Sequence, residues 1–198
     1  ANPYHAVMAR RAQGYLPLVV DSKEKLSGIL VARNDSPIRE LKELDGQAVA
    51  FPAPNAFAAS LLMRARLAQQ GTRIQPKYVK THANVYRAVI MGDVAAGGGA
   101  NNTLERESPY LREQLRVIHQ TPGYAPHPFV AHPRVAPQLR EAVTQAFLQL
   151  GQDAQDSKLL DAIQIPNPVR ADYARDFAPL ESLHLDRFVL LNEKNRDQ

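Results

Sequence analysis

Two short stretches place polar groups where a strand ends and a helix begins, an arrangement suited to holding an anion. In the first, an apolar strand from Gln47 to Phe51 is followed by two prolines, Asn55 and a helix-forming segment. We predict that Asn55 is the N-cap, its side-chain oxygen accepting from the amides of Phe57 and Ala58. A helix N-terminus carries unpaired N–H groups and a partial positive charge of roughly half a unit, so it attracts anions. The alternative is an ordinary strand-helix unit without a ligand.

The second stretch, Thr81-His82, also lies directly after a predicted strand and opens a predicted helix. In open α/β sheets, ligands bind beyond the carboxyl ends of the strands. An imidazole beside a second helix N-terminus would suit an oxyanion with several acceptor oxygens. His82 is therefore a candidate ligand donor. An exposed residue in the capping region is an equally good interpretation from the sequence.

The other polar groups form no pattern typical of catalysis or metal binding. Gly97-Gly98-Gly99 matches neither glycine-rich nucleotide motif, and we expect it to form a turn, with close backbone approach as the alternative role. The spacings of His119, His127 and His132 match no helical or finger-type metal site. No serine lies at a glycine-flanked strand-to-helix elbow, and the paired carboxylates fall in polar loops. The sequence therefore predicts no enzyme, no cofactor and no metal site.

The composition is that of an ordinary globular protein. The 198 residues are 44% hydrophobic and 22% charged, and 24 basic against 20 acidic side chains give a net charge of +4. The basic residues are scattered, so nucleic acid is not an expected partner. Cysteine is absent, which excludes disulfides and fits an oxidising compartment. There is no apolar run near the roughly 20 residues that span a membrane. We find no signal-peptide pattern, and an exported protein would have lost it or had it left out.

Alternating strands and helices predict a parallel α/β fold. Glycines end several of the predicted helices, and short apolar runs lie between the helices. We expect helices at 3–13, 35–45, 56–70, 83–91, 137–150 and 157–163, and strands at 15–20, 27–33, 47–51, 75–80, 93–96, 115–119 and 128–132. Such alternation favours a parallel sheet with helices on its faces. The first helix has no strand before it, so the sequence begins in the middle of a strand-helix unit.

Several of these segments together resemble a known family. They are, in order, Asn2-Pro3-Tyr4, Ile29-Leu30-Val31, Asp35-Ser36-Pro37-Ile38, Leu44 to Phe51, Thr81-His82 and Val89 to Gly92. As a set they resemble the phosphate/phosphonate-type solute-binding proteins of ABC importers. The resemblance implies the type II periplasmic-binding-protein fold, two α/β lobes with mainly parallel sheets. Residues 1–30 would belong to the first lobe, 31–115 would form the second, and 116–198 would return to the first lobe and supply C-terminal helices.

The same resemblance carries expectations about location and partners. It implies a periplasmic or lipid-anchored extracytoplasmic protein with a small anionic ligand and an ABC permease as its membrane partner. In the family, the first lobe begins with strands that precede the position of residue 1. We therefore expect that the sequence is shortened or that another segment or chain completes this lobe.

Only part of the family's binding site carries over to this sequence. His82 matches the family's binding histidine, and Tyr4 lies close to its aromatic contact from the first lobe. The family's hydroxyl-bearing run is replaced by Ala56 to Ala59, in which Phe57 either provides an aromatic surface or fills core. The family's acidic residue falls at Ala95, so a typical aminoalkylphosphonate is not expected. The expected ligand contacts are Tyr4, Asn55, Ala56, Phe57, Ala58 and His82.

These expectations describe a solute-binding component of an ABC importer that holds a phosphate- or phosphonate-like oxyanion between two lobes. Ligand binding would favour a closed form of the protein, which the membrane partner would recognise. Two alternatives stay open. The first is a periplasmic ligand-sensing module of a signalling protein with the same fold. The second, less favoured, is an α/β enzyme that uses His82.

Overall fold

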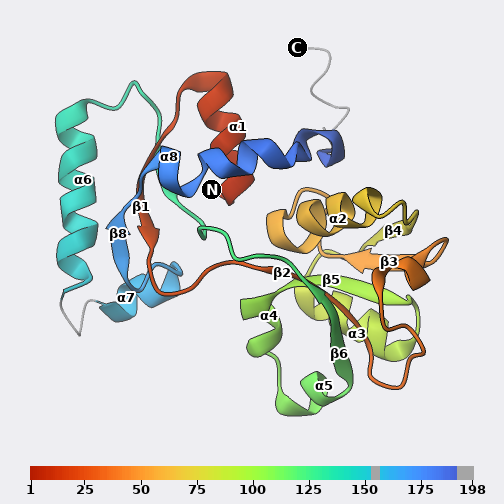
Figure 1. Cartoon of the computed structure of the whole chain (residues 1–198). Coiled ribbons are helices and arrows are strands. Elements are labelled where there is room, and N and C mark those ends of the chain that lie inside the picture. The colour runs from red at the N-terminus through yellow and green to blue at the C-terminus, as the bar shows by residue number, and fades with distance from the viewer. Residues whose placement is uncertain (153–156, 191–198) are drawn as a thin grey trace. The chain divides into compact units, whose positions relative to one another are not determined.

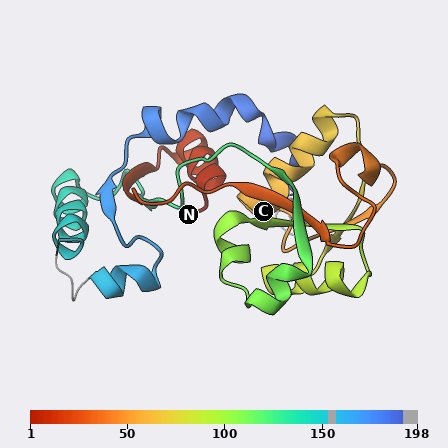
Figure 2. The ribbon, with the colours of Figure 1, turned by 60° about the horizontal axis from the view of Figure 1, so that its bottom comes forward.

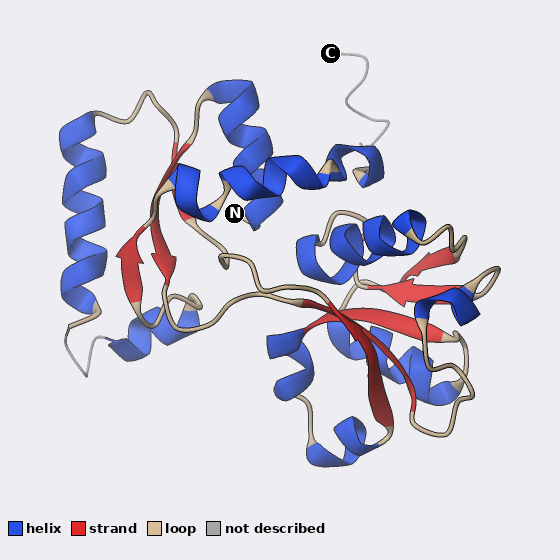
Figure 3. Cartoon of the chain, viewed as in Figure 1, coloured by secondary structure: helices blue, strands red, loops and turns tan. Residues whose placement is uncertain are grey.

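A computed structural model describes residues 1–152 and 157–190, and the chain divides into two compact units (Figure 1). Unit 1 comprises residues 1–25 and 124–184. Unit 2 comprises residues 26–123 and the C-terminal segment that begins at Leu185. Each unit contains a sheet with helices packed beside it, as Figure 3 shows, so the predicted α/β class is confirmed.

Among the described residues, unit 1 carries an antiparallel sheet with β1 in the middle. Strand β1 (Leu16–Asp21) pairs with β7 (Phe129–Ala131) on one side and with β8 (Pro168–Arg170) on the other. The helical elements of the unit are α1 (Pro3–Gln13), α6 (Pro137–Leu150), α7 (Ser157–Ala162), α8 (Tyr173–Asp176) and the 3-10 turn η3 (Ala178–Leu183). The three helices predicted in this part of the sequence are therefore confirmed.

Helix α1 illustrates how directly the sequence sets these bounds. The side-chain oxygen of Asn2 accepts from the His5 amide at 2.8 Å, which satisfies one of the unpaired donors of the first turn. Pro3 occupies the first helical position, where a missing N–H costs nothing. Gly14 ends the helix with a φ of +71°, a left-handed conformation that glycine adopts without strain.

Unit 2 contains, within its described residues, a mixed sheet in the order β4-β3-β5-β2-β6. The strands are β2 (Gly28–Arg33), β3 (Ala48–Phe51), β4 (Gln75–Tyr78), β5 (Ala96–Ala100) and β6 (Leu115–Gln120). The helical elements are η1 (Leu41–Leu44), η2 (Phe57–Leu62), α2 (Met63–Gln69), α3 (His82–Met91), α4 (Asn101–Glu105), α5 (Pro109–Glu113) and η4 (Leu185–Phe188). Helices α2 and α3 cover opposite faces of the sheet (Figures 1 and 2).

The expectation of mainly parallel sheets is wrong. In the described part of the chain, β3 runs parallel to β4 and to β5, but the pairs made by β2 and by β1 are antiparallel. The parallel pairs occur only among β3, β4 and β5, where α2 and α3 connect successive strands. A parallel pair requires a crossover connection of a dozen or more residues, whereas antiparallel neighbours do not.

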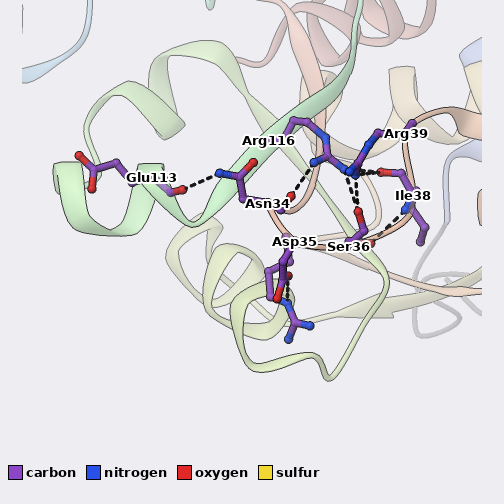
Figure 4. Close-up of polar contacts among 8 residues, drawn as sticks. Asn34, Asp35, Ser36, Ile38, Arg39, Glu113 and Arg116 are labelled. Carbon is purple, nitrogen blue, oxygen red and sulfur yellow. Dashed lines mark hydrogen bonds and ion pairs between the residues drawn. The ribbon is translucent and has the colours of Figure 1, made fainter.

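Of the helix expected at 35–45, only the short 3-10 helix η1 is present. Leu41 and Leu44 are buried, as the pattern predicts, but the residues before them form no helix. Their carbonyls bond to an arginine of β6 instead. The Arg116 guanidinium donates to the carbonyl oxygens of Asn34 at 2.7 Å, Ser36 at 3.3 Å and Ile38 at 2.5 Å (Figure 4).

We expect an Arg116→Ala variant to lose about 1–2 kcal/mol of unfolding free energy, because the carbonyls of Ser36 and Ile38 are partly buried. The Nε atom of Arg116 is buried without a partner among the described residues, and its removal limits the loss. Urea denaturation measures the change. Arg112→Ala, which alters an exposed arginine of α5, is the control and should stay within about 0.5 kcal/mol. Equal effects of the two variants would contradict the proposed role of Arg116.

The predicted glycine turn is also wrong, because Gly97-Gly98-Gly99 forms the buried middle of strand β5. The alternative role, close backbone approach, is confirmed. A Cβ at Gly97 would lie 2.5 Å from the Val85 side chain, and one at Gly98 would lie 2.1 Å from the carbonyl oxygen of Ala59. A Cβ at Gly97 would point toward α3 and one at Gly98 toward η2, on opposite faces of the sheet. Both helical elements therefore pack directly against the backbone of β5.

Candidate functional site

Three strands of unit 2 end at one edge of its sheet. Because β3, β4 and β5 are parallel, the segments that follow them meet at this edge, and each begins a helical element: η2, α3 and α4 (Figure 1). This is the edge of an open α/β sheet where ligands bind. The structure thus brings the two stretches predicted from the sequence, near residues 55 and 82, to the same side of unit 2.

Asn55 is not the N-cap of the helical element η2 that follows β3, so that prediction is wrong. The capping position belongs to Ala56, which has no polar side chain. The Asn55 amide instead pairs with the backbone of Leu190, donating to its carbonyl oxygen at 2.8 Å and accepting from its amide at 2.9 Å. A side-chain amide offers the same donor and acceptor as a peptide group, and the partner lies too far along the sequence for a local pattern to predict it.

Further contacts hold the loop before η2 in place. The carbonyl oxygen of Pro54 accepts from Ser60 Oγ at 2.9 Å and from Arg64 Nη1 at 3.1 Å. The Arg64 guanidinium lies 5.7 Å from the centre of the Phe188 ring in η4. The loop therefore has defined geometry even though Asn55 does not cap the helix.

The helix predicted at 56–70 is confirmed, and its first part is a π-helix. The amides of Ser60 and Leu61 both donate to the carbonyl of Ala56, at 2.9 and 3.0 Å. Amides of the first turn precede these donors and lack an intrahelical acceptor, as at any helix start. As whole residues, Phe57 and Ala58 are only 3% and 5% exposed. Phe57 therefore fills core rather than forming an exposed surface.

His82 is the first residue of α3, one position before the predicted helix start at residue 83. Thr81 caps the helix by accepting from the Asn84 amide at 3.1 Å. The His82 ring is partly buried, and this burial lowers its pKa, which favours the neutral imidazole. Its Nδ1 atom lies 3.4 Å from Thr103 Oγ1 in α4. The interpretation of His82 as an exposed capping residue does not fit these contacts.

Thr103 and Tyr86 join His82 at this edge, and the sequence patterns did not indicate either residue. Thr103 Oγ1 lies 2.7 Å from the Tyr86 hydroxyl and 2.8 Å from the carbonyl oxygen of Ala100. Two signals were available. Tyr86 follows His82 by four positions, which places both side chains on one face of a helix. Thr103 lies three residues beyond the end of β5, in the first turn of α4.

A sequence profile of the family described as "ABC transporter, phosphonate, periplasmic substrate-binding protein" matches residues 1–177. The chain belongs to this family. Phosphonate-type substrate-binding proteins bind small solutes outside the cytoplasm and work with ABC permeases, so the protein is a binding component and not an enzyme. No curated protein sequence matches the chain.

Several solved structures share the fold of this chain. XAC2383 from Xanthomonas citri, bound to ATP, has a TM-score of 0.85 at 17% identity, over 95% of this chain and 78% of that one. An ABC phosphonate transporter binding protein from Pseudomonas aeruginosa has a TM-score of 0.78 at 18% identity, covering 92% and 66%. PhnD1 from Prochlorococcus marinus, in complex with methylphosphonate, has 0.75 at 16%, covering 92% and 75%. The predicted type II periplasmic-binding-protein fold is confirmed.

Two other positions expected from the family pattern lie elsewhere. Ala95 precedes β5, at the end of the strand opposite to Thr103, so the missing carboxylate there does not alter this edge. Tyr4 is a buried residue of α1 in unit 1, and its contact with a ligand stays a prediction.

Within residues 1–152 and 157–190, no three histidine, aspartate or glutamate side chains gather as a metal site. Nor does this part of the chain contain a helix of the length and apolarity needed to cross a bilayer.

Proposed function

We propose that this protein is the receptor for a small phosphonate- or phosphate-like oxyanion and that the edge of unit 2 described above supplies its anion contacts. The observation that carries the proposal is that the first turns of η2 and α3 lie at one sheet edge with the partly buried His82. Two helix N-termini and an imidazole offer several N–H donors to an anion with several acceptor oxygens.

The amides of Phe57 and Ala58 are the proposed contacts from η2. They belong to the first turn, ahead of the first intrahelical donors. The Ala56 amide is directed at the carbonyl of Ala53 at 3.4 Å and is the less suitable donor. Asn55 contributes indirectly, since its pairing with Leu190 holds the preceding loop. Because the run Ala56 to Ala59, which includes Phe57, stands where the family resemblance places hydroxyl residues, backbone donors are the proposed contacts from this segment.

The solved relatives supply ligand classes to test. PhnD1 holds methylphosphonate, and SsuA from Escherichia coli, which has a TM-score of 0.66 at 18% identity, is an aliphatic sulphonate-binding protein. Delivery of the ligand to an ABC permease follows from the family. Closure of two lobes on the ligand, with Tyr4 as a contact, stays a prediction of the family resemblance.

A thermal-shift panel of inorganic phosphate, methylphosphonate, sulfate, methanesulfonate and acetate tests the proposal. A ligand present at 100 times its Kd should add about 2.7 kcal/mol to the unfolding free energy and raise the Tm. We expect the largest shift with methylphosphonate or phosphate. If none of the five anions raises the Tm, the proposed anion site is absent.

A further inference from the structure

The chain from Leu185 to Leu190, which we call the η4 segment, belongs to unit 2 and contains the short helix η4. It packs against η2 and α2. Of its six residues, all of them described, only Leu185 is buried. Parts of a protein with few buried apolar side chains open more readily than its core. The η4 segment is therefore an element that can detach while the sheet of unit 2 stays folded.

Two contacts join the η4 segment to consecutive residues of the loop before η2. The Asn55 side chain donates to the Leu190 carbonyl oxygen at 2.8 Å and accepts from the Leu190 amide at 2.9 Å. The Arg64 guanidinium donates to the Pro54 carbonyl oxygen at 3.1 Å and lies 5.7 Å from the centre of the Phe188 ring. The segment thus contacts one loop residue directly and the other through an arginine of α2.

This loop leads directly into the first turn of η2. Ala56 follows Asn55, and its carbonyl oxygen accepts from the amides of Ser60 and Leu61 at 2.9 and 3.0 Å. The two amides proposed above as ligand donors lie within the same turn. A displacement of Asn55 would therefore move the turn that is expected to hold the anion.

An alternative is that the loop is rigid without the η4 segment. Pro52 and Pro54 each fix one backbone dihedral, and the Ser60 hydroxyl donates to the Pro54 carbonyl oxygen at 2.9 Å. These restraints all lie within the loop and the helical element it begins. The Asn55 pair differs because it joins the loop to a second element. A loop that is already ordered binds a ligand with a smaller entropic penalty, so such a restraint would raise affinity.

We propose that Asn55 and Arg64 are positioning residues through which the η4 segment holds the first turn of η2 in its ligand-binding geometry, and that docking of this segment and binding of the oxyanion strengthen each other. The ligand half rests on the proposed function, whereas the positioning half does not. If the docked segment raises the affinity by some factor, bound ligand must favour the docked segment by the same factor.

Amide hydrogen exchange tests the positioning half without any ligand. The amides of Ser60 and Leu61 are buried and bond to the start of η2 in wild type. In Asn55→Ala, these two amides should exchange at least about fivefold faster, because the turn opens more often. Unchanged exchange in folded Asn55→Ala would show that the loop is rigid on its own and would overturn the proposal. If this variant does not fold, Phe188→Ala, which removes the other contact, decides by the same measurement.

Asn34→Ala is the matched control. The Asn34 side chain also bonds to a distant backbone group, the Glu113 carbonyl oxygen at 3.1 Å, but it lies beyond β2 at the opposite end of the unit 2 sheet. The exchange of Ser60 and Leu61 should therefore match wild type. Equal acceleration in the control would mean that unit 2 loosens as a whole and would contradict a specific role of Asn55.

Calorimetric titration with methylphosphonate tests the coupling. Asn55→Ala should bind at least about fivefold more weakly than wild type, and Asn34→Ala should bind like wild type. In wild type, saturating methylphosphonate should slow the exchange of the Leu190 amide by a similar factor. Wild-type affinity in folded Asn55→Ala, or Leu190 exchange that does not respond to the ligand, would overturn the coupling. If neither methylphosphonate nor phosphate binds wild type, the proposed function and the coupling fail together, while the exchange of Ser60 and Leu61 still decides the positioning role.

Discussion

A Gly98→Ala variant is expected to lose about 3 kcal/mol of unfolding free energy, because a methyl group has no room in the middle of the unit 2 sheet. The added Cβ would lie 2.1 Å from the Ala59 carbonyl oxygen and 2.5 Å from the Phe51 ring. Backbone atoms of η2 cannot rotate away as a flexible side chain could, so the helix and the strand must separate. For a chain of this size the loss corresponds to a fall in Tm of about 6–12 °C. Differential scanning calorimetry measures it.

Gly46→Ala is the matched control for this substitution. Nothing lies within 4 Å of a Cβ at Gly46, but its φ of +74° is unfavourable for alanine. The backbone strain should cost about 1–2 kcal/mol. A larger loss for Gly98→Ala than for Gly46→Ala is therefore expected. The reverse order would mean that η2 and β5 are not in close contact.

A His82→Ala variant is expected to bind the oxyanion about 10- to 100-fold more weakly than wild type. A hydrogen bond to a charged group contributes about 1.5–3 kcal/mol, and each 1.4 kcal/mol is a factor of ten in affinity. The free energy of unfolding of unit 2 should fall by less than the free energy of binding, because the His82 ring is only partly buried. Calorimetric titration with methylphosphonate measures the affinity, and a melting curve checks the fold.

Arg87→Ala distinguishes a local contact from general electrostatic attraction. Arg87 is an exposed residue of the same helix, and its removal takes away a full positive charge. Charges at the surface are screened within about 10 Å at 0.1 M salt, so the affinity should change less than about twofold. Unchanged affinity of His82→Ala would remove His82 from the site. Equal losses in both variants would indicate that charge alone attracts the ligand.

The sequence predicted those parts of the fold that depend on neighbouring residues. The helix from Pro3 is bounded by Asn2 and Gly14, and the helix at His82 is bounded by Thr81 and Gly92, all of which act as the patterns indicate. The placement of His82 at a helix start was predictable for the same reason. In each case the deciding hydrogen bonds join residues a few positions apart.

The failures involve partners that are distant in sequence. Asn55 pairs with Leu190, and the carbonyls after Asn34 bond to Arg116, so neither segment follows its local preference. Gly97 to Gly99 form part of strand β5 rather than a turn, and α3 and η2 pack closely against them from opposite faces of the sheet. Thr103 was missed because its importance arises from contacts with Tyr86 and His82 that only the folded sheet creates.

The most direct test of the central claim is a titration of nitrogen-15-labelled protein with methylphosphonate, followed by NMR. We expect saturable shifts that are largest for the backbone amides of Phe57 and Ala58 and for the ring nitrogens of His82. Saturable shifts that leave all three groups unchanged, or no saturable shift at all, would contradict it.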